Sequence, residues 1–104
     1  MSLENNYQPN LILKKVDVNI TSNAIKKIMD KLNYGEIERI IIVFSNKQYN
    51  NVIVIFKKWN IHLTYSTRLL LNRGKYLTIY YNDTQFWKVY EHSSRKRVNN
   101  FSHK

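Results

Sequence analysis

The sequence predicts an α+β domain in which a four-stranded antiparallel sheet carries two helices on one face. The main observation is the order of the hydrophobic patterns between residues 11 and 90, which is strand, helix, strand, strand, helix, strand. The second is the length of 104 residues, which suits a single domain. Two right-handed βαβ crossovers of this kind place both helices on one side of the sheet, with the first and third strands central. The other side of the sheet is expected to stay open.

The first half of the predicted domain contains a strand and a helix. Apolar and polar residues alternate in residues 11–20, which is typical of a strand with one buried face. Thr21 or Ser22 can cap the helix that follows, in which apolar residues recur every three or four positions. Gly35 is expected to end this helix as its C-terminal cap.

The next two strands are expected to form a hairpin. Residues 37–44 and 52–56 are rich in β-branched side chains, which favour strands. Residues 45–51 include three Asn and no branched aliphatic side chain, which is typical of a hairpin connection. The two strands should therefore pair antiparallel.

The last predicted elements are a short helix and the fourth strand. The helix is capped near Thr64 and ends before Gly74. The fourth strand covers residues 76–81, and Asn82 and Asp83 then turn the chain.

The chain is strongly basic, with 17 Lys and Arg against 7 Asp and Glu and a formal net charge of +10. An excess of this size is typical of proteins that contact phosphates, although basic proteins also bind acidic proteins. Most of the charge falls in residues 11–90, the predicted domain. Residues 1–10 are expected to be a flexible leader and residues 91–104, with the run Arg95-Lys96-Arg97, a basic disordered tail.

Several functional classes have little support in the sequence. There is no Cys, so disulfides and thiolate metal sites are excluded. No apolar run reaches the roughly 20 residues of a membrane span, and no secretory signal begins the chain, so an intracellular protein with no membrane partner is expected. Three scattered His and two Gly provide neither a metal-ligand spacing nor a phosphate loop. We expect no enzyme, no cofactor and no metal.

Residues 34–40, 55–59, 79–83 and 86–88 give the chain a resemblance to a known family. With the order of elements, residues 11–90 resemble the RNA recognition motif, which has the ferredoxin-like split βαβ fold (βαββαβ). More narrowly, they resemble the small RNA-recognition-motif-like proteins of large DNA viruses. The resemblance implies a viral protein in the host cytoplasm or nucleus that binds single-stranded nucleic acid, with RNA as the first candidate.

In that family, aromatic residues on the two central strands stack on bases. By position, the resemblance places Tyr49, Asn51 and Ile53 on the open face of the third strand, with Val54 and Phe56 in the core. It places Asp17 at the stacking position of the first strand. Ile53 and Asp17 depart from the family pattern because neither residue is aromatic. Each departure removes a stacking contribution of about 1–3 kcal/mol per base.

The leading hypothesis is therefore nucleic-acid binding by a domain with an incomplete aromatic platform. Tyr49, Ile53 and Tyr80 are the candidates for contact with bases. The candidates for contact with phosphates are Arg39, Lys47, Lys57, Lys58, Lys75 and Lys88.

The apolar composition of the open face supports an alternative. Ile41, Val43, Ile53 and Ile55 would form a larger apolar patch than soluble monomers usually expose. Residues 86–90, with Phe86, Trp87 and Tyr90, could fold back over this patch, or a protein partner or a second copy could cover it. In the last two cases the domain is a protein-interaction or homodimerisation module.

Overall fold

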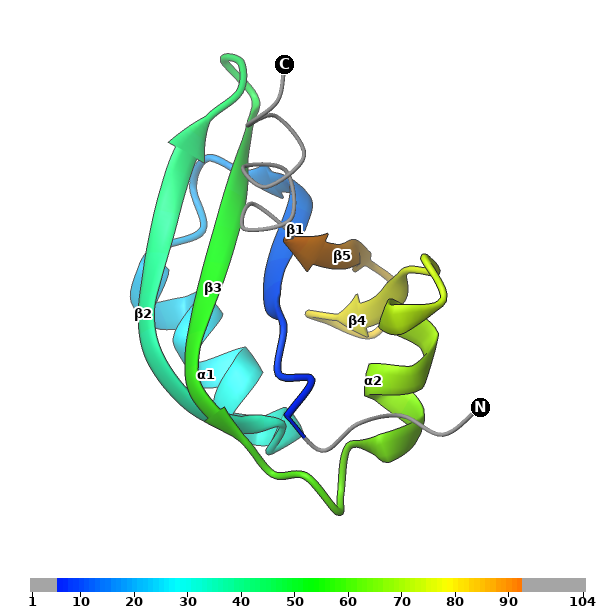
Figure 1. Ribbon diagram of the computed structural model, residues 1–104. Helices are drawn as coiled ribbons and strands as arrows, with labels where there is room; N and C mark the ends of the chain where they lie inside the picture. The colour runs from blue at the N-terminus through cyan, green and yellow to red at the C-terminus, as the bar shows by residue number, and fades with distance from the viewer. Residues whose placement is uncertain (1–5, 93–104) are drawn as a thin grey trace, which may run out of the picture.

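The structure is a computed structural model that describes residues 6–92. It contains two helices and one five-stranded antiparallel sheet, so the predicted α+β class is confirmed (Figure 1). The elements are β1 (Asn10–Asp17), α1 (Ser22–Leu32), β2 (Gly35–Phe44), β3 (Tyr49–Trp59), α2 (Tyr65–Asn72), β4 (Leu77–Tyr80) and β5 (Phe86–His92). The strand order in the sheet is β2-β3-β1-β5-β4, which puts β1 in the middle.

The prediction of four strands is wrong, because residues 86–92 form a fifth. β5 pairs with β1, where Leu13 lies opposite Val89, and it separates β1 from the predicted fourth strand, which is the edge strand β4. The side chain of Asn82 accepts hydrogen bonds from the backbone N–H groups of Thr84 and Gln85 and closes the turn between β4 and β5. β5, the hairpin partner of β4, thus occupies the position beside β1.

The predicted fold-back of residues 86–90 over the open face is also wrong. Trp87 is 1% exposed and Val89 is fully buried, so both point toward the helices. Their neighbours on β5 point to the other side of the sheet because side chains alternate along a strand. Burying Trp87 in the core removes more apolar surface from water than laying it across an exposed face would.

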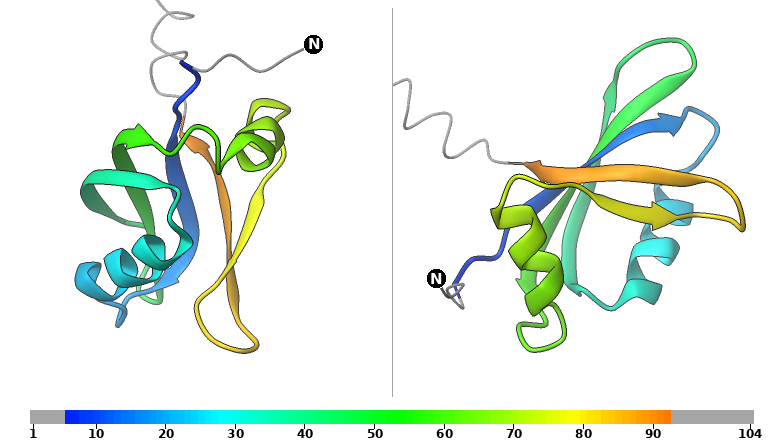
Figure 2. Two further views of the ribbon diagram at one scale, coloured as in Figure 1. Left: turned by 90° about the horizontal axis from the view of Figure 1, so that it is seen from below. Right: turned by 90° about the vertical axis from the view of Figure 1, so that its right-hand side faces the viewer.

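The core lies between the sheet and the two helices. In the right-hand view of Figure 2 both helices lie on the same side of the sheet, as the sequence predicts. Helix α1 contributes Ile25 and Met29 to the core, and α2 contributes Leu71. The strands contribute Leu11, Leu13, Val16, Val52, Val54, Phe56, Trp59, Leu77, Ile79, Trp87 and Val89.

The two ends of α1 differ in how well they were predicted. Thr21 is the N-cap, and its hydroxyl accepts a hydrogen bond of 3.1 Å from the backbone N–H of Ala24. At the other end, the left-handed residue is Asn33, with φ 56°, and the prediction of Gly35 as the cap is wrong. Gly35 begins β2, and a Cβ there would lie 2.6 Å from the Cα of Trp59, so the glycine permits close approach of the backbones of β2 and β3.

The segment before β1, predicted as part of a flexible leader, is hydrogen-bonded to the domain. The backbone and indole N–H groups of Trp59 donate to the Gln8 side chain at 2.9 Å and to the Pro9 carbonyl at 2.8 Å. The guanidinium group of Arg68, which is 1% exposed, donates to the Tyr7 carbonyl at 3.2 Å. These contacts tie the segment to both β3 and α2.

Candidate functional site

The sheet face opposite the helices is open in the part of the chain that the structure describes. A row of four side chains crosses it from β2 to β5: Ile41 lies opposite Ile53, Ile53 opposite Ile12, and Ile12 opposite Tyr90. All four are half-buried. The row shows that the open face is aliphatic over β2, β3 and β1 and becomes aromatic at β5.

The aromatic half of this face contains two contacting pairs of rings. The ring centroids of Tyr80 and Phe86 are 5.3 Å apart, and those of Tyr76 and Tyr90 are 5.6 Å apart, both in tilted geometry. Tyr80 is 59% exposed and Phe86 43% exposed, so each ring also has a surface free for other contacts. Each ring restricts its neighbour, which gives a partly fixed aromatic surface over β4 and β5.

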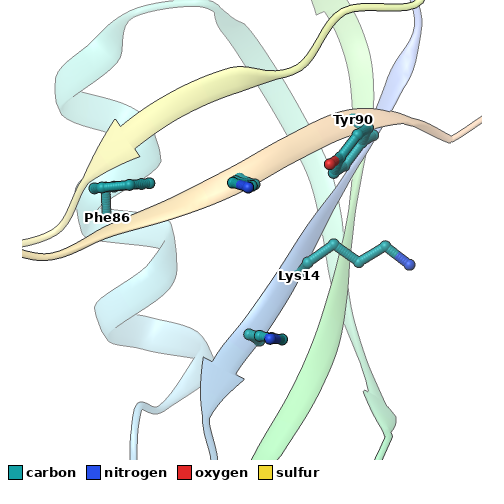
Figure 3. A pocket seen from close by; sticks show the side chains of 5 residues that line it. Lys14, Phe86 and Tyr90 are labelled. Atoms are coloured by element: carbon teal, nitrogen blue, oxygen red, sulfur yellow. The ribbon is translucent and has the colours of Figure 1, made fainter.

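An open depression of about 510 Å³ lies beside these rings, between β1 and β5. Figure 3 shows Lys14 on β1 and Phe86 and Tyr90 on β5 around it. Lys15 and Lys88 also line it, so among residues 6–92 the lining has three lysines, two aromatic residues and no carboxylate. Positively charged side chains and aromatic rings share one surface here.

Lys14 and Lys15 reach this surface together because β1 contains an irregularity. The register between β1 and β3 shifts between Leu13 and Val16, and Lys15 has φ 55°. Leu13 and Val16 are 0% and 1% exposed, although residues three apart in a regular strand face opposite sides. The extra residue lets both apolar side chains enter the core and leaves both lysines exposed.

Three of the predicted contact residues lie in or near the depression. Lys88 lines it, and its ammonium group lies 5.0 Å from the centroid of the Tyr76 ring. Tyr80 contacts Phe86, and Ile53 lies in the central row. The structure therefore brings together part of the predicted site on one face.

The other predicted residues do not line the depression. Arg39 lies opposite Ile55 on β2, and β3 separates it from β1. The ammonium group of Lys57 lies 3.8 Å from the Glu36 carboxylate. Tyr49 is half-buried at the start of β3, and the remaining three are exposed: Lys47 between β2 and β3, Lys58 near the end of β3 and Lys75 between α2 and β4.

Asp17, at the predicted stacking position of the first strand, has a local structural role. Its carboxylate accepts a hydrogen bond of 2.8 Å from the backbone N–H of Asn19, and it lies opposite Tyr49. The carboxylate thus stabilises the turn after β1 and does not line the depression.

Sequence reasoning missed four lining residues of the depression: Lys14, Lys15, Phe86 and Tyr90. For the two aromatic residues a signal was present, since Phe86-Trp87-Lys88-Val89-Tyr90 alternates as a strand does. Taking that segment as a strand places both rings on the face opposite Trp87. For Lys15 there was no local signal, because a bulge depends on the partner strand.

Two tyrosines on the helix side of the sheet have shifted pKa values. Burial raises the pKa of Tyr7, the Glu91 carboxylate raises it further, and the Arg68 guanidinium opposes the rise. Burial also raises the pKa of Tyr34, against a smaller opposite effect of its hydrogen bond with Thr67. Both phenols therefore stay neutral to higher pH than an exposed tyrosine.

Comparison of the chain with protein-family models, with curated proteins and with solved structures gives no match. Within residues 6–92, no group of three or more His, Asp or Glu side chains is placed to hold a metal ion. In the same residues, no helix has the length and apolar character needed to cross a membrane. The chemistry of the open face is thus the basis for a functional assignment.

Proposed function

We propose that this chain binds single-stranded nucleic acid, with RNA as the first candidate, on the open face of its sheet. The observation that supports this most is the depression that Lys14, Lys15 and Lys88 line together with Phe86 and Tyr90, with no carboxylate among the described lining residues. Proteins that bind single strands combine cations that follow the phosphate backbone with aromatic rings on which bases stack. This surface has both components within one depression.

The topology supports an RNA-recognition-motif-like domain of the ferredoxin-like split βαβ type. Strands β1 and β3 are neighbours, β2 pairs with β3, and β5 pairs with β1 after the crossover through α2. In this assignment β4 is an additional edge strand that precedes the last strand of the motif. Aromatic platforms of the motif lie on the two central strands, whereas the exposed rings of this chain lie on β5 and around β4.

The proposed contacts lie around the depression, whereas most residues of the predicted set lie outside it. Phe86, Tyr90 and Tyr80 stack on bases, while Lys14, Lys15 and Lys88 contact phosphates. The predicted basic residues outside the depression add an attraction for phosphates that does not depend on base sequence. Lys57 contributes least because Glu36 lies beside it. These residues are Arg39, Lys47, Lys57, Lys58 and Lys75.

Fluorescence anisotropy with a labelled single-stranded RNA at several salt concentrations tests the proposal. The logarithm of the binding constant should fall linearly with the logarithm of salt, by about 0.7 per neutralised phosphate and hence about 2 for three lysines. Single-stranded DNA and duplex RNA of the same length serve as comparisons, and the duplex should bind more weakly because its bases cannot reach the rings. Absence of binding, or binding insensitive to salt, would exclude this function.

The aliphatic half of the open face favours a second candidate, a protein-interaction or homodimerisation module. Ile12, Ile41 and Ile53 form a half-exposed row that a second copy or another protein can bury. Sedimentation velocity of the purified chain distinguishes the two candidates. A dimer that Ile53→Asp converts to a monomer supports this module, whereas a monomer that binds RNA supports the first candidate.

A further inference from the structure

Strand β1 has a lysine at a position where the backbone favours glycine. Lys15 and Asn33 are the two non-glycine residues with positive φ in residues 6–92, at 55° and 56°. Asn33 ends α1, where asparagine is a common left-handed residue. Lys15 instead occupies a bulge inside a strand, where glycine is the usual left-handed residue. A lysine there keeps a backbone conformation that L residues rarely adopt.

The bulge determines that positions 14 and 15 of β1 both face outward. Leu13 and Val16 both enter the core, so the two residues between them must both stay on the exposed side. Glycine at position 15 would satisfy the backbone equally well and with less strain. The lysine side chain therefore contributes something other than the fold, and its position on the depression indicates what that is.

Lys14 and Lys15, like most lysines in residues 6–92, lie outside the two ion pairs of the domain. Lys26 forms an ion pair with Asp30 at 2.9 Å, and Lys57 lies 3.8 Å from Glu36. Within residues 6–92, neither lysine of the bulge forms an ion pair. Two lysines without an ion-pair partner among the described residues, both on the wall of a depression, are suited to an external anion.

We propose that the Lys14–Lys15 bulge is the phosphate clamp of the depression, and that the bases of the bound strand lie on Phe86 and Tyr90. This inference rests on the proposed function and specifies which strand holds the backbone of the ligand. The lysines are on β1 and the rings on β5, the neighbouring strand, where Ile12 lies opposite Tyr90. A single-stranded segment fits this arrangement, because its phosphates and unpaired bases can reach the two strands at once.

The variant Lys15→Gly tests the clamp, because it removes the charge and keeps the backbone of the bulge. It should unfold in urea at the same or a higher midpoint than the natural protein. For labelled single-stranded RNA, the magnitude of the salt slope should fall by about 0.7, which corresponds to one lost phosphate contact. Affinity at low salt should fall with it.

Two control variants separate the effects of charge and backbone. Asn33→Gly relieves the other left-handed residue, at the end of α1, and should leave the RNA affinity and the salt slope unchanged. Lys27→Gln removes one exposed positive charge from α1, on the opposite side of the sheet, and should also leave the slope unchanged. If the clamp is correct, Lys15→Gly has a smaller salt slope and a lower RNA affinity than either control variant.

The outcomes distinguish the clamp from the function it depends on. If the natural protein binds RNA and Lys15→Gly binds with the same affinity and slope, the clamp is wrong and the proposed function stands. If the natural protein does not bind RNA with salt dependence, both are wrong. If Lys15→Gly does not unfold cooperatively, Lys14→Gln is judged by the same slope criterion.

Discussion

The ammonium group of Lys88 lies over the ring of Tyr76, 5.0 Å from its centroid, and connects β5 to the residue before β4. Cation–π contacts at exposed sites contribute about 0.5–1 kcal/mol. A double-mutant cycle with Lys88→Gln and Tyr76→Leu, measured by urea unfolding, should give a coupling free energy in this range. A coupling free energy near zero would show that the ammonium group is not held over the ring in solution.

Phe86→Ala should weaken binding of single-stranded RNA by about 1–3 kcal/mol, because one stacking surface is lost. Tyr65→Ala is a matched control, since Tyr65 is also 43% exposed but lies on α2, on the other side of the sheet. Anisotropy titrations of both variants at one salt concentration compare them. Equal losses in the two variants would argue against β5 as the stacking strand.

Gly35→Ala should destabilise the fold by about 3 kcal/mol, since a new Cβ meets backbone that cannot move aside easily. The Cβ would lie 2.6 Å from the Cα of Trp59. Gly74→Ala is the comparison, because its Cβ meets open space and only the left-handed φ of 81° opposes it, at about 1 kcal/mol. Urea unfolding of both variants measures the difference, and a smaller loss for Gly35→Ala would contradict close approach of β2 and β3.

Alkaline pH should destabilise the protein partly through Tyr7. Burial and Glu91 raise the pKa of its phenol in the folded state, so the folded protein binds more protons than the unfolded chain above about pH 10. The contribution of this group to stability is complete below that pH and is lost as the pH rises further.

Urea midpoints measured on both sides of this pH should therefore fall less for Tyr7→Phe than for the natural protein. Tyr65→Phe, which removes an exposed hydroxyl group, is the control. An identical alkaline loss in the natural protein and in Tyr7→Phe would show that the Tyr7 phenol does not titrate differently in the two states.

The order of the elements from β1 to β4 could be predicted from the sequence because it depends on short-range periodicity. Val54 and Phe56 are buried as predicted, and Tyr80 is exposed beside the buried Ile79. Thr21 caps α1 because its hydroxyl needs only the N–H groups of the next turn. Each of these features is decided within about ten residues of chain.

The sequence by itself thus determined the α+β class, the hairpin of β2 and β3 and a basic surface. Only the tertiary structure decided that Phe86–His92 pairs with β1 and that Lys15 occupies a bulge. Alternation tells which side chains of a strand share a face, but the neighbour of that strand depends on which pairing buries the most apolar surface across the whole domain. The depression lies between two strands separated by about 70 residues in the chain, so its lining follows from that long-range pairing.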